Sequence, residues 1–271
     1  MKDSKDRYDV SMPLTAQGCF SVLTLKQTPG ELMEKVERVC QESFEAVIQR
    51  LNASYAIFRE RTGQPQEPLP WKAKTVTFGE LYQEALASGG KDFEAAFAQE
   101  QQRVREDLEQ GKTYMIEANF RLIDRIYDFI EDVSPRIVYG LMPPYYPNVS
   151  NCYFQGIAPE ARDMSQRLNA YTQARYGQAY DREYFYTGIC DLSYINIDDP
   201  AAQRKSVSQS MPLFGWYYDI PFEDIQAISM AGINIGPWGK DFHKLTERVF
   251  MPDLYDRTPH ILDHAISLLL E

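Results

Sequence analysis

The residues with the clearest capacity for chemistry lie near the end of the chain, where a glycine-rich loop leads to a histidine. The segment from Gly232 to Val249 reads GINIGPWGKDFHKLTERV and contains His243, one of 3 histidines in the 271-residue sequence. A neutral imidazole can ligate a metal or transfer a proton. The apolar run at 233–235 predicts a strand, and the loops at strand ends are the usual ligand sites of open α/β sheets. His243 is therefore the leading candidate site residue.

Two carboxylates are candidate partners for His243. Glu247 follows it on the same loop, and Asp191 ends a different predicted strand at residues 184–190. Because strand ends in one sheet can converge on one crevice, we take these three residues as the candidate site. A catalytic zinc ion, however, needs about three protein ligands and an open position. The three residues therefore account for part of a metal site, and a hydrogen-bonded structural role for His243 stays open.

Other candidate groups are weaker. His260 and His264 share a face of a predicted C-terminal helix, but the catalytic glutamate of the zincin pattern is missing, which favours packing or surface roles. Cys190 near His243 would make a nucleophile pair only with a lowered thiol pKa, which nothing in the sequence indicates. The motifs G-x-S-x-G, G-x-G-x-x-G, H-E-x-x-H and the P-loop are absent.

Composition narrows the class of protein. The formal net charge of -11 disfavours nucleic acid and anionic membranes as partners. No apolar run reaches the roughly 20 residues of a membrane span, and the charged N-terminus lacks a signal-peptide core. The 4 cysteines are widely spaced and predict neither a disulfide framework nor a cysteine zinc site. We expect a cytoplasmic protein with reduced thiols.

The first half of the chain predicts long helices. Residues 19–25 predict a strand, and Thr28, Pro29 and Glu31 make a capping box that starts a helix ending at Gly63. Apolar residues recur along this helix every three or four positions, which predicts a face packed on the core. A short strand at 74–77 and three helices follow, at 78–87, around 93–108 and around 116–130.

The second half alternates strand and helix. Strands are predicted at 136–141, 184–190 and 233–235, and helices at 159–176, 222–230 and 259–270. This order is typical of an α/β fold, a largely parallel sheet with helices on both faces. We place a domain boundary near residue 111, between an α+β region at 1–111 and an α/β domain at 112–271.

The tract from Ile235 to Val249 resembles the C-terminal motif of the zinc aminoacylase and carboxypeptidase family of metallopeptidases. The fuller match is to its arginine-utilisation branch, the RocB family. It includes Tyr8–Pro13, Thr28–Pro29 with its long helix, Pro143–Pro147 and Gly188–Tyr194. The resemblance implies that residues 1–111 are part of an inserted lid and dimerisation domain, and that residues 112–271 are the C-terminal half of a catalytic domain.

The resemblance also implies roles. His243 would be the last ligand of a two-zinc site, Asp191 an acidic residue near the substrate crevice, and Glu247 a carboxylate that orients the site. The implied activity is metal-dependent hydrolysis of a small acylamino acid or peptide amide, in arginine degradation, by a protein that can form a homodimer.

The chain departs from this family in one large respect. The His-x-Asp segment, the bridging aspartate and the general-base glutamates of that family have no counterpart, because no histidine precedes His243. We therefore expect a C-terminal portion that lacks the N-terminal catalytic half and is inactive alone. The alternative is a non-catalytic binding or dimerisation module of the same fold, with tyrosines that hold a small ligand or a partner: Tyr145, Tyr146, Tyr217 and Tyr218.

Overall fold

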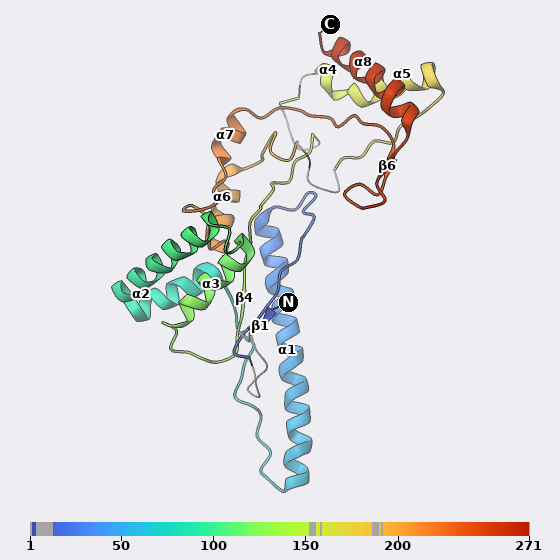
Figure 1. The fold of residues 1–271 in the computed structure, drawn as a ribbon. Helices are drawn as coiled ribbons and strands as arrows, with labels where there is room; N and C mark the ends of the chain where they lie inside the picture. The colour runs from blue at the N-terminus through green and yellow to red at the C-terminus, as the bar shows by residue number, and fades with distance from the viewer. Residues whose placement is uncertain are drawn as a thin grey trace. The chain divides into compact units, whose positions relative to one another are not determined.

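The structure, a computed structural model, describes residues 2–3, 13–151, 156–157, 159–185, 190 and 192–270, without the side chains of residues 2, 3, 159 and 160. The chain forms two compact units, each built from two stretches of sequence (Figure 1). Unit 1 is Met1–Tyr146 with Asp199–Pro221, and unit 2 is Pro147–Asp198 with Phe222–Glu271. The fold is mixed α/β and mostly helical, and the sheets among the described residues are two-stranded.

Unit 1 contains four helices and two small sheets among its described residues. The helices are α1 (Pro29–Thr62), α2 (Phe78–Glu109), α3 (Met115–Tyr127) and α6 (Pro200–Ser210). Strands β1 (Lys2–Asp3) and β2 (Ala16–Gln17) pair antiparallel, and β3 (Thr75–Thr77) and β4 (Ile137–Tyr139) pair parallel. The parallel register joins Val76 to Val138.

Helix α1 begins and ends where the sequence predicts. The Thr28 hydroxyl accepts from the Glu31 amide at 3.3 Å, and the Thr28 amide donates to the Glu31 carboxylate at 2.9 Å. Gly63 ends the helix with φ 65°, a left-handed conformation that glycine adopts without a steric cost. The apolar face departs from prediction. Leu32 and Met33 are buried, but farther along the helix the apolar side chains are half-buried, as Phe44 and Tyr55 are, or exposed, as Leu51 is.

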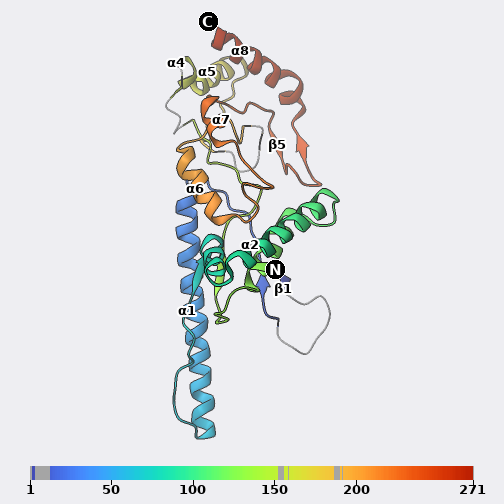
Figure 2. The same cartoon turned by 90° about the vertical axis from the view of Figure 1, so that its left-hand side faces the viewer.

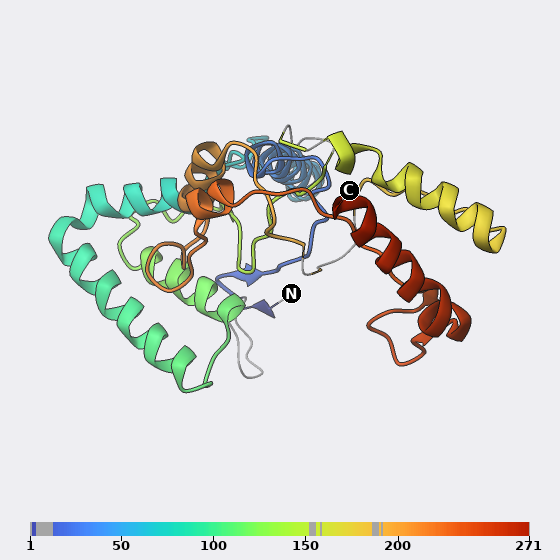
Figure 3. The ribbon, with the colours of Figure 1, turned by 90° about the horizontal axis from the view of Figure 1, so that it is seen from above.

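The core of unit 1 lies between α2 and α3. Helix α2 bends at Gly90, which has φ 49° (Figure 3). Gly89 must be small, because a Cβ there would come within 2.6 Å of the Phe129 ring. The bend lets both arms of α2 contribute to one cluster, which includes Leu81, Ala85, Phe93, Phe97, Val104, Leu122 and Ile126. The helices predicted at 78–87, 93–108 and 116–130 are thus confirmed, with the first two joined across the bend.

Unit 2 is built around the packing of α5 (Met164–Tyr176) against α8 (Thr258–Leu270), seen together in Figure 2. Its core holds Met164, Leu168, Ile261, Ala265 and Leu268. The remaining elements are short: α4 (Pro159–Arg162), α7 (Phe222–Ala227), the π-helix η1 (Asp253–Arg257), and strands β5 (Gly239–Lys240) and β6 (Arg248–Val249). β5 and β6 pair antiparallel.

Two predicted strands are wrong. Residues 19–25 are irregular, and Phe20 and Leu23 are exposed, because no strand pairs with this segment. Residues 233–235 are also irregular, and the nearby pairing is the β5–β6 hairpin. Most of the strand predicted at 184–190 lies outside the described residues.

Larger features of the predicted architecture stay predictions. Within the described part of the chain, β3 and β4 are the only strands that pair in parallel, so a largely parallel sheet with helices on both faces is not seen there. The domain boundary predicted near residue 111 falls inside unit 1, between two helices that pack together. Helix α6 was not predicted, although Asp199 before Pro200 is a recognisable start: its carboxylate accepts from the Ala202 amide at 3.0 Å.

Candidate functional site

The candidate loop is the turn of the β5–β6 hairpin, residues 241–247. Gly239 pairs with Val249 and Lys240 with Arg248. A Cβ on Gly239 would come within 2.8 Å of the Arg248 carbonyl oxygen, so this close strand pairing requires glycine. The loop itself is held by Asp241, whose carboxylate accepts hydrogen bonds from Arg248 and, at 3.2 Å, from the Thr246 hydroxyl.

His243 stands in a left-handed backbone conformation on this loop, with φ 60°. Asp241 shares that conformation, also at φ 60°. Such a conformation is uncommon outside glycine and is often found at functional sites. The His243 side chain is exposed, and its ring meets the Phe242 ring edge-on at 5.5 Å between centroids. The imidazole is therefore presented to solvent rather than held in the core.

The grouping of His243 with Glu247 and Asp191 stays a prediction. Glu247 is exposed on the same loop, where its amide donates to the Lys244 carbonyl oxygen at 3.0 Å. Asp191 lies outside the described residues. Cys190 accepts a weak hydrogen bond at 3.7 Å from the Asn234 side chain, so its recorded thiol contact does not involve His243.

The base of the hairpin is anchored by a residue that sequence reasoning missed. Asp253 is 4% exposed and accepts from the Trp238 amide at 3.1 Å and from Arg257 at 2.8 Å. The Phe250 amide closes the base by donating to the Trp238 carbonyl oxygen at 2.8 Å. The signal in the sequence is the i,i+4 spacing of Asp253 and Arg257. This anchor ties the loop that carries His243 to the start of α8.

The described residues do not fit a zinc centre at His243. Among them, no group of three or more histidine, cysteine, aspartate or glutamate side chains is placed to hold a metal ion. Zinc in proteins takes three or four such ligands. One exposed imidazole with a neighbouring carboxylate falls short of that number.

The other two histidines have packing and hydrogen-bonding roles. His260 Nδ1 lies 2.7 Å from the Asp256 carbonyl oxygen, a hydrogen bond in which the ring nitrogen donates. The His264 ring stacks on Tyr171 at 4.1 Å between centroids. With these contacts, the rings of His260 and His264 are engaged separately rather than with a shared metal ion.

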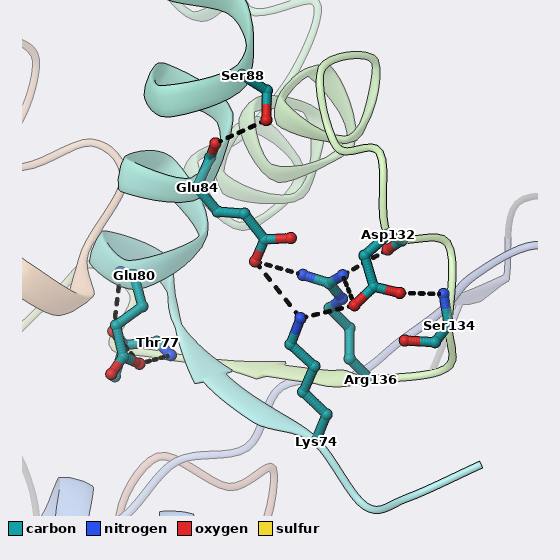
Figure 4. A network of polar contacts seen from close by, with 8 residues as sticks. All are labelled: Lys74, Thr77, Glu80, Glu84, Ser88, Asp132, Ser134 and Arg136. Atoms are coloured by element: carbon teal, nitrogen blue, oxygen red, sulfur yellow. Dashed lines mark hydrogen bonds and ion pairs between the residues drawn. The ribbon is translucent and has the colours of Figure 1, made fainter. Parts of the chain in front are cut away.

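A cluster of four charged residues lies in unit 1, beside the β3–β4 pair (Figure 4). Arg136, with its side chain 1% exposed, donates to Glu84 at 2.8 Å and also reaches Asp132. Lys74 approaches Asp132 at 2.8 Å and Glu84 at 3.6 Å. The Lys74 hydrogen bond holds the pKa of Asp132 well below its usual range. These contacts tie both strands to α2, so we assign the cluster a structural role.

The predicted tyrosine surface is largely packed away. Tyr145 is buried, and its hydroxyl donates to Gln203 at 2.7 Å. The Tyr218 hydroxyl accepts from the Tyr145 amide at 3.0 Å, and Tyr217 packs against the core of unit 1. Burial raises the pKa of Tyr145. Tyr145 thus serves packing, Tyr217 and Tyr218 are half-buried against the same unit, and a ligand-binding role for these tyrosines stays a prediction.

Among the described residues, no helix combines the length and apolar character that crossing a bilayer requires.

Comparison with known proteins finds related sequences but no related solved structure. No family model matches the chain, and no solved structure matches it. The uncharacterized protein YqjN of Bacillus subtilis is 28% identical over 275 residues, which cover 100% of this chain and 47% of YqjN. Protein RocB of Bacillus subtilis is 24% identical over 277 residues, which cover 100% of this chain and 46% of RocB. The chain is therefore a distant homologue of RocB and YqjN along its whole length, and it spans about half the length of each.

Proposed function

We propose that this chain works as one part of a RocB-like, zinc-dependent amidohydrolase, and that its 241–247 loop presents His243 to a metal centre completed by a second part. The observation that carries the proposal is the homology with RocB, which runs through the whole chain yet covers 46% of RocB. The rest of such a protein has room for the ligands that the described residues do not supply.

The hairpin has the properties that this role needs. Its base is fixed by Asp253, while His243 at its tip is exposed and available to a second protein surface. Exposed apolar side chains lie on the hairpin and next to it in the sequence, among them Trp238, Leu245 and Met251. Apolar residues gathered at a surface often mark an interface with another domain. On this proposal the larger parallel sheet also forms with the second part.

The proposed substrate is a small acylamino acid or peptide amide, with a role in arginine degradation. This substrate class comes from the family that the sequence resembles. His243 is assigned as a zinc ligand, Glu247 as a carboxylate that orients the site, and Asp191 as an acidic residue near the substrate. The chain on its own is expected to be inactive, because these residues are too few to hold a catalytic zinc ion.

Zinc content tests the proposal. The purified chain should bind no stoichiometric zinc by itself, and it should acquire zinc when co-expressed with a segment homologous to the unmatched half of RocB. His243→Ala should lower the zinc content of the complex, while His260→Ala, a matched change at an exposed histidine of unit 2, should leave it unchanged. A complex that forms but binds no zinc would refute the metal-centre assignment.

A non-catalytic binding or dimerisation module of the same fold is the second candidate. The observation that favours it is that the described residues hold no cluster of metal ligands. The two candidates differ in one result. If the complex with the homologous segment hydrolyses no acylamino acid, and the His243→Ala complex has the same zinc content and ligand binding as the unmodified complex, the module is the better description.

A further inference from the structure

The hairpin that carries His243 is held together from within. Strand β5 pairs with β6, and in the turn the Asp241 carboxylate accepts hydrogen bonds from Arg248 and, at 3.2 Å, from the Thr246 hydroxyl. The strands and the turn are therefore joined into one piece. The place of the His243 side chain in unit 2 then depends on the contacts at the base of the hairpin.

A row of aromatic rings that contains one arginine runs from the base of the hairpin to α5 and α8. Neighbours in the row lie 4.1–6.4 Å apart, measured between ring centroids or from a centroid to the guanidinium carbon. Contacts at such distances are attractive, both between rings and between a ring and a cation. In order, the members are Trp238, Phe250, Arg257, Tyr176, Tyr171 and His264. The row joins the two stretches of sequence that build unit 2.

Arg257 connects the hairpin end of this row to the helix end. Its guanidinium carbon lies 5.5 Å from the centroid of the Phe250 ring and 5.9 Å from that of Tyr176. The same guanidinium donates to Asp253 at 2.8 Å, and the side chains of Arg257 and Asp253 are 22% and 6% exposed. The attraction between a cation and a ring grows as water is excluded. Arg257 therefore binds Phe250 on one side and Tyr176 on the other from a largely buried position.

The backbone around Arg257 has a rare geometry. Residues Asp253–Arg257 form the π-helix η1, in which the Thr258 amide donates to the Asp253 carbonyl oxygen. Such turns are uncommon and are frequent at functional sites. Within this turn Tyr255 and Asp256 are exposed, whereas Asp253 and Arg257 point into unit 2 and contact each other. The turn thus directs its ion pair toward the base of the hairpin.

We propose that η1 is a clamp in which Arg257, held by Asp253 and seated between Phe250 and Tyr176, is a positioning residue for His243. The clamp fixes the hairpin to the end of α5. The clamp itself is a property of unit 2, and its value for catalysis rests on the function proposed above.

The contact with α5 separates a clamp from a local ion pair. The pair of Asp253 and Arg257 alone would fix the hairpin only to the adjacent start of α8. Tyr176 is the last residue of α5, and its ring also meets Tyr171, which stacks on His264 of α8. Loss of the Tyr176 ring should therefore loosen a hairpin that is distant from it in the sequence.

The first test is amide hydrogen exchange across residues 239–249 of the full chain, which reports local opening of the hairpin. Tyr176→Leu leaves the Asp253–Arg257 pair in place and should speed exchange by roughly 3- to 10-fold, as loss of one cation–π contact does. Arg257→Met also removes the hydrogen bond to Asp253 and should speed exchange by roughly 30-fold or more. Arg257→Lys keeps the charge and should restore part of the protection. Tyr255→Leu, a matched change at an exposed tyrosine of η1, should leave exchange unchanged.

The second test separates positioning from a general loss of structure. In Arg257→Met, the backbone order parameter of His243 should fall from about 0.85 to below about 0.6, the range of a flexible segment. The order parameter of His264, whose ring stacks between α5 and α8, should stay unchanged. An equal fall at His264 would overturn the proposal. Unchanged exchange at 239–249 in both Arg257→Met and Tyr176→Leu would also overturn it.

The outcome is independent of the test of the proposed function. Both measurements use the chain alone and no metal ion, so a clamp is confirmed or refuted whatever the complex with a second part shows. If Arg257→Met loosens the hairpin but His243→Ala leaves the zinc content of the complex unchanged, the clamp stands and the metal-centre assignment fails. If His243→Ala lowers the zinc content but neither clamp variant changes exchange, the clamp fails alone.

Discussion

Replacing Arg136 by methionine should destabilise unit 1 more than any change of an exposed arginine. The Arg136 side chain is 1% exposed, and it donates to Glu84 at 2.8 Å, in the cluster that ties β4 to α2 (Figure 4). Methionine keeps much of the apolar stem and removes the guanidinium. The change therefore isolates the polar contacts.

The expected loss follows from the burial of the two partners. Removing one member of a buried ion pair costs about 3–5 kcal/mol. The Glu84 side chain is 31% exposed and regains water, and Lys74 remains 3.6 Å from it, so the penalty is reduced. Arg136 Nε also lacks a hydrogen-bond partner, and methionine removes that cost. We expect the free energy of unfolding to fall by about 2–3 kcal/mol, a value that includes no contribution from the exposed Asp132 carboxylate.

Urea unfolding followed by far-ultraviolet circular dichroism measures this loss, because α1, α2 and α3 dominate the helical signal. Arg103→Met is the matched control on the surface of α2, where the side chain is 60% exposed, and it should cost less than about 0.5 kcal/mol. In a double-mutant cycle, Arg136→Met and Glu84→Gln should couple by about 1 kcal/mol or more. A loss equal to that of Arg103→Met, or no coupling, would refute the structural role of the cluster.

Three further changes test other parts of the structure. Gly140→Ala puts a Cβ within 2.3 Å of the Ser210 carbonyl oxygen at the end of α6. The free energy of unfolding should therefore fall by about 1–3 kcal/mol, with a lower melting temperature. Gly18→Ala, where a Cβ meets nothing within 4 Å, should leave the melting temperature unchanged. Asp253→Asn should speed amide exchange in the β5–β6 hairpin, because Arg257 loses its charged acceptor, and Asp256→Asn should leave exchange unchanged. Asp132 has a lowered pKa when folded, so its stabilising effect is present above about pH 4 and is lost as the pH falls further. In urea titrations from pH 6 downward, the difference between the unmodified chain and Asp132→Asn should therefore shrink below about pH 4.

Local features of the fold were predictable because they depend on neighbours in the chain. The capping box at Thr28 and Glu31, the stop at Gly63 and the helix breaks around Gly89 act within one turn of backbone. The glycines of the 232–249 segment also indicated an irregular loop around His243, and the structure has an exposed hairpin turn there.

Burial and strand pairing were decided by residues distant in sequence. The apolar run at 19–25 has the composition of a strand, yet it forms none, and no strand of the described residues pairs with it. The periodic face of α1 predicts burial, but the fold buries only its first part fully and leaves the rest half-buried or exposed. Tyr145 was expected on a surface, and its contact with Gln203, distant in sequence, buries it instead.

The sequence alone therefore determined where most helices begin and end, the relation to RocB, and the loop that carries the candidate histidine. Only the tertiary structure decided which apolar faces are covered, how Lys74, Glu84, Asp132 and Arg136 meet, and that His243 faces solvent on an anchored hairpin. The physical reason is that helix caps and turns are satisfied by adjacent residues. Burial, charge pairing and metal ligation require side chains that the chain brings together from distant positions.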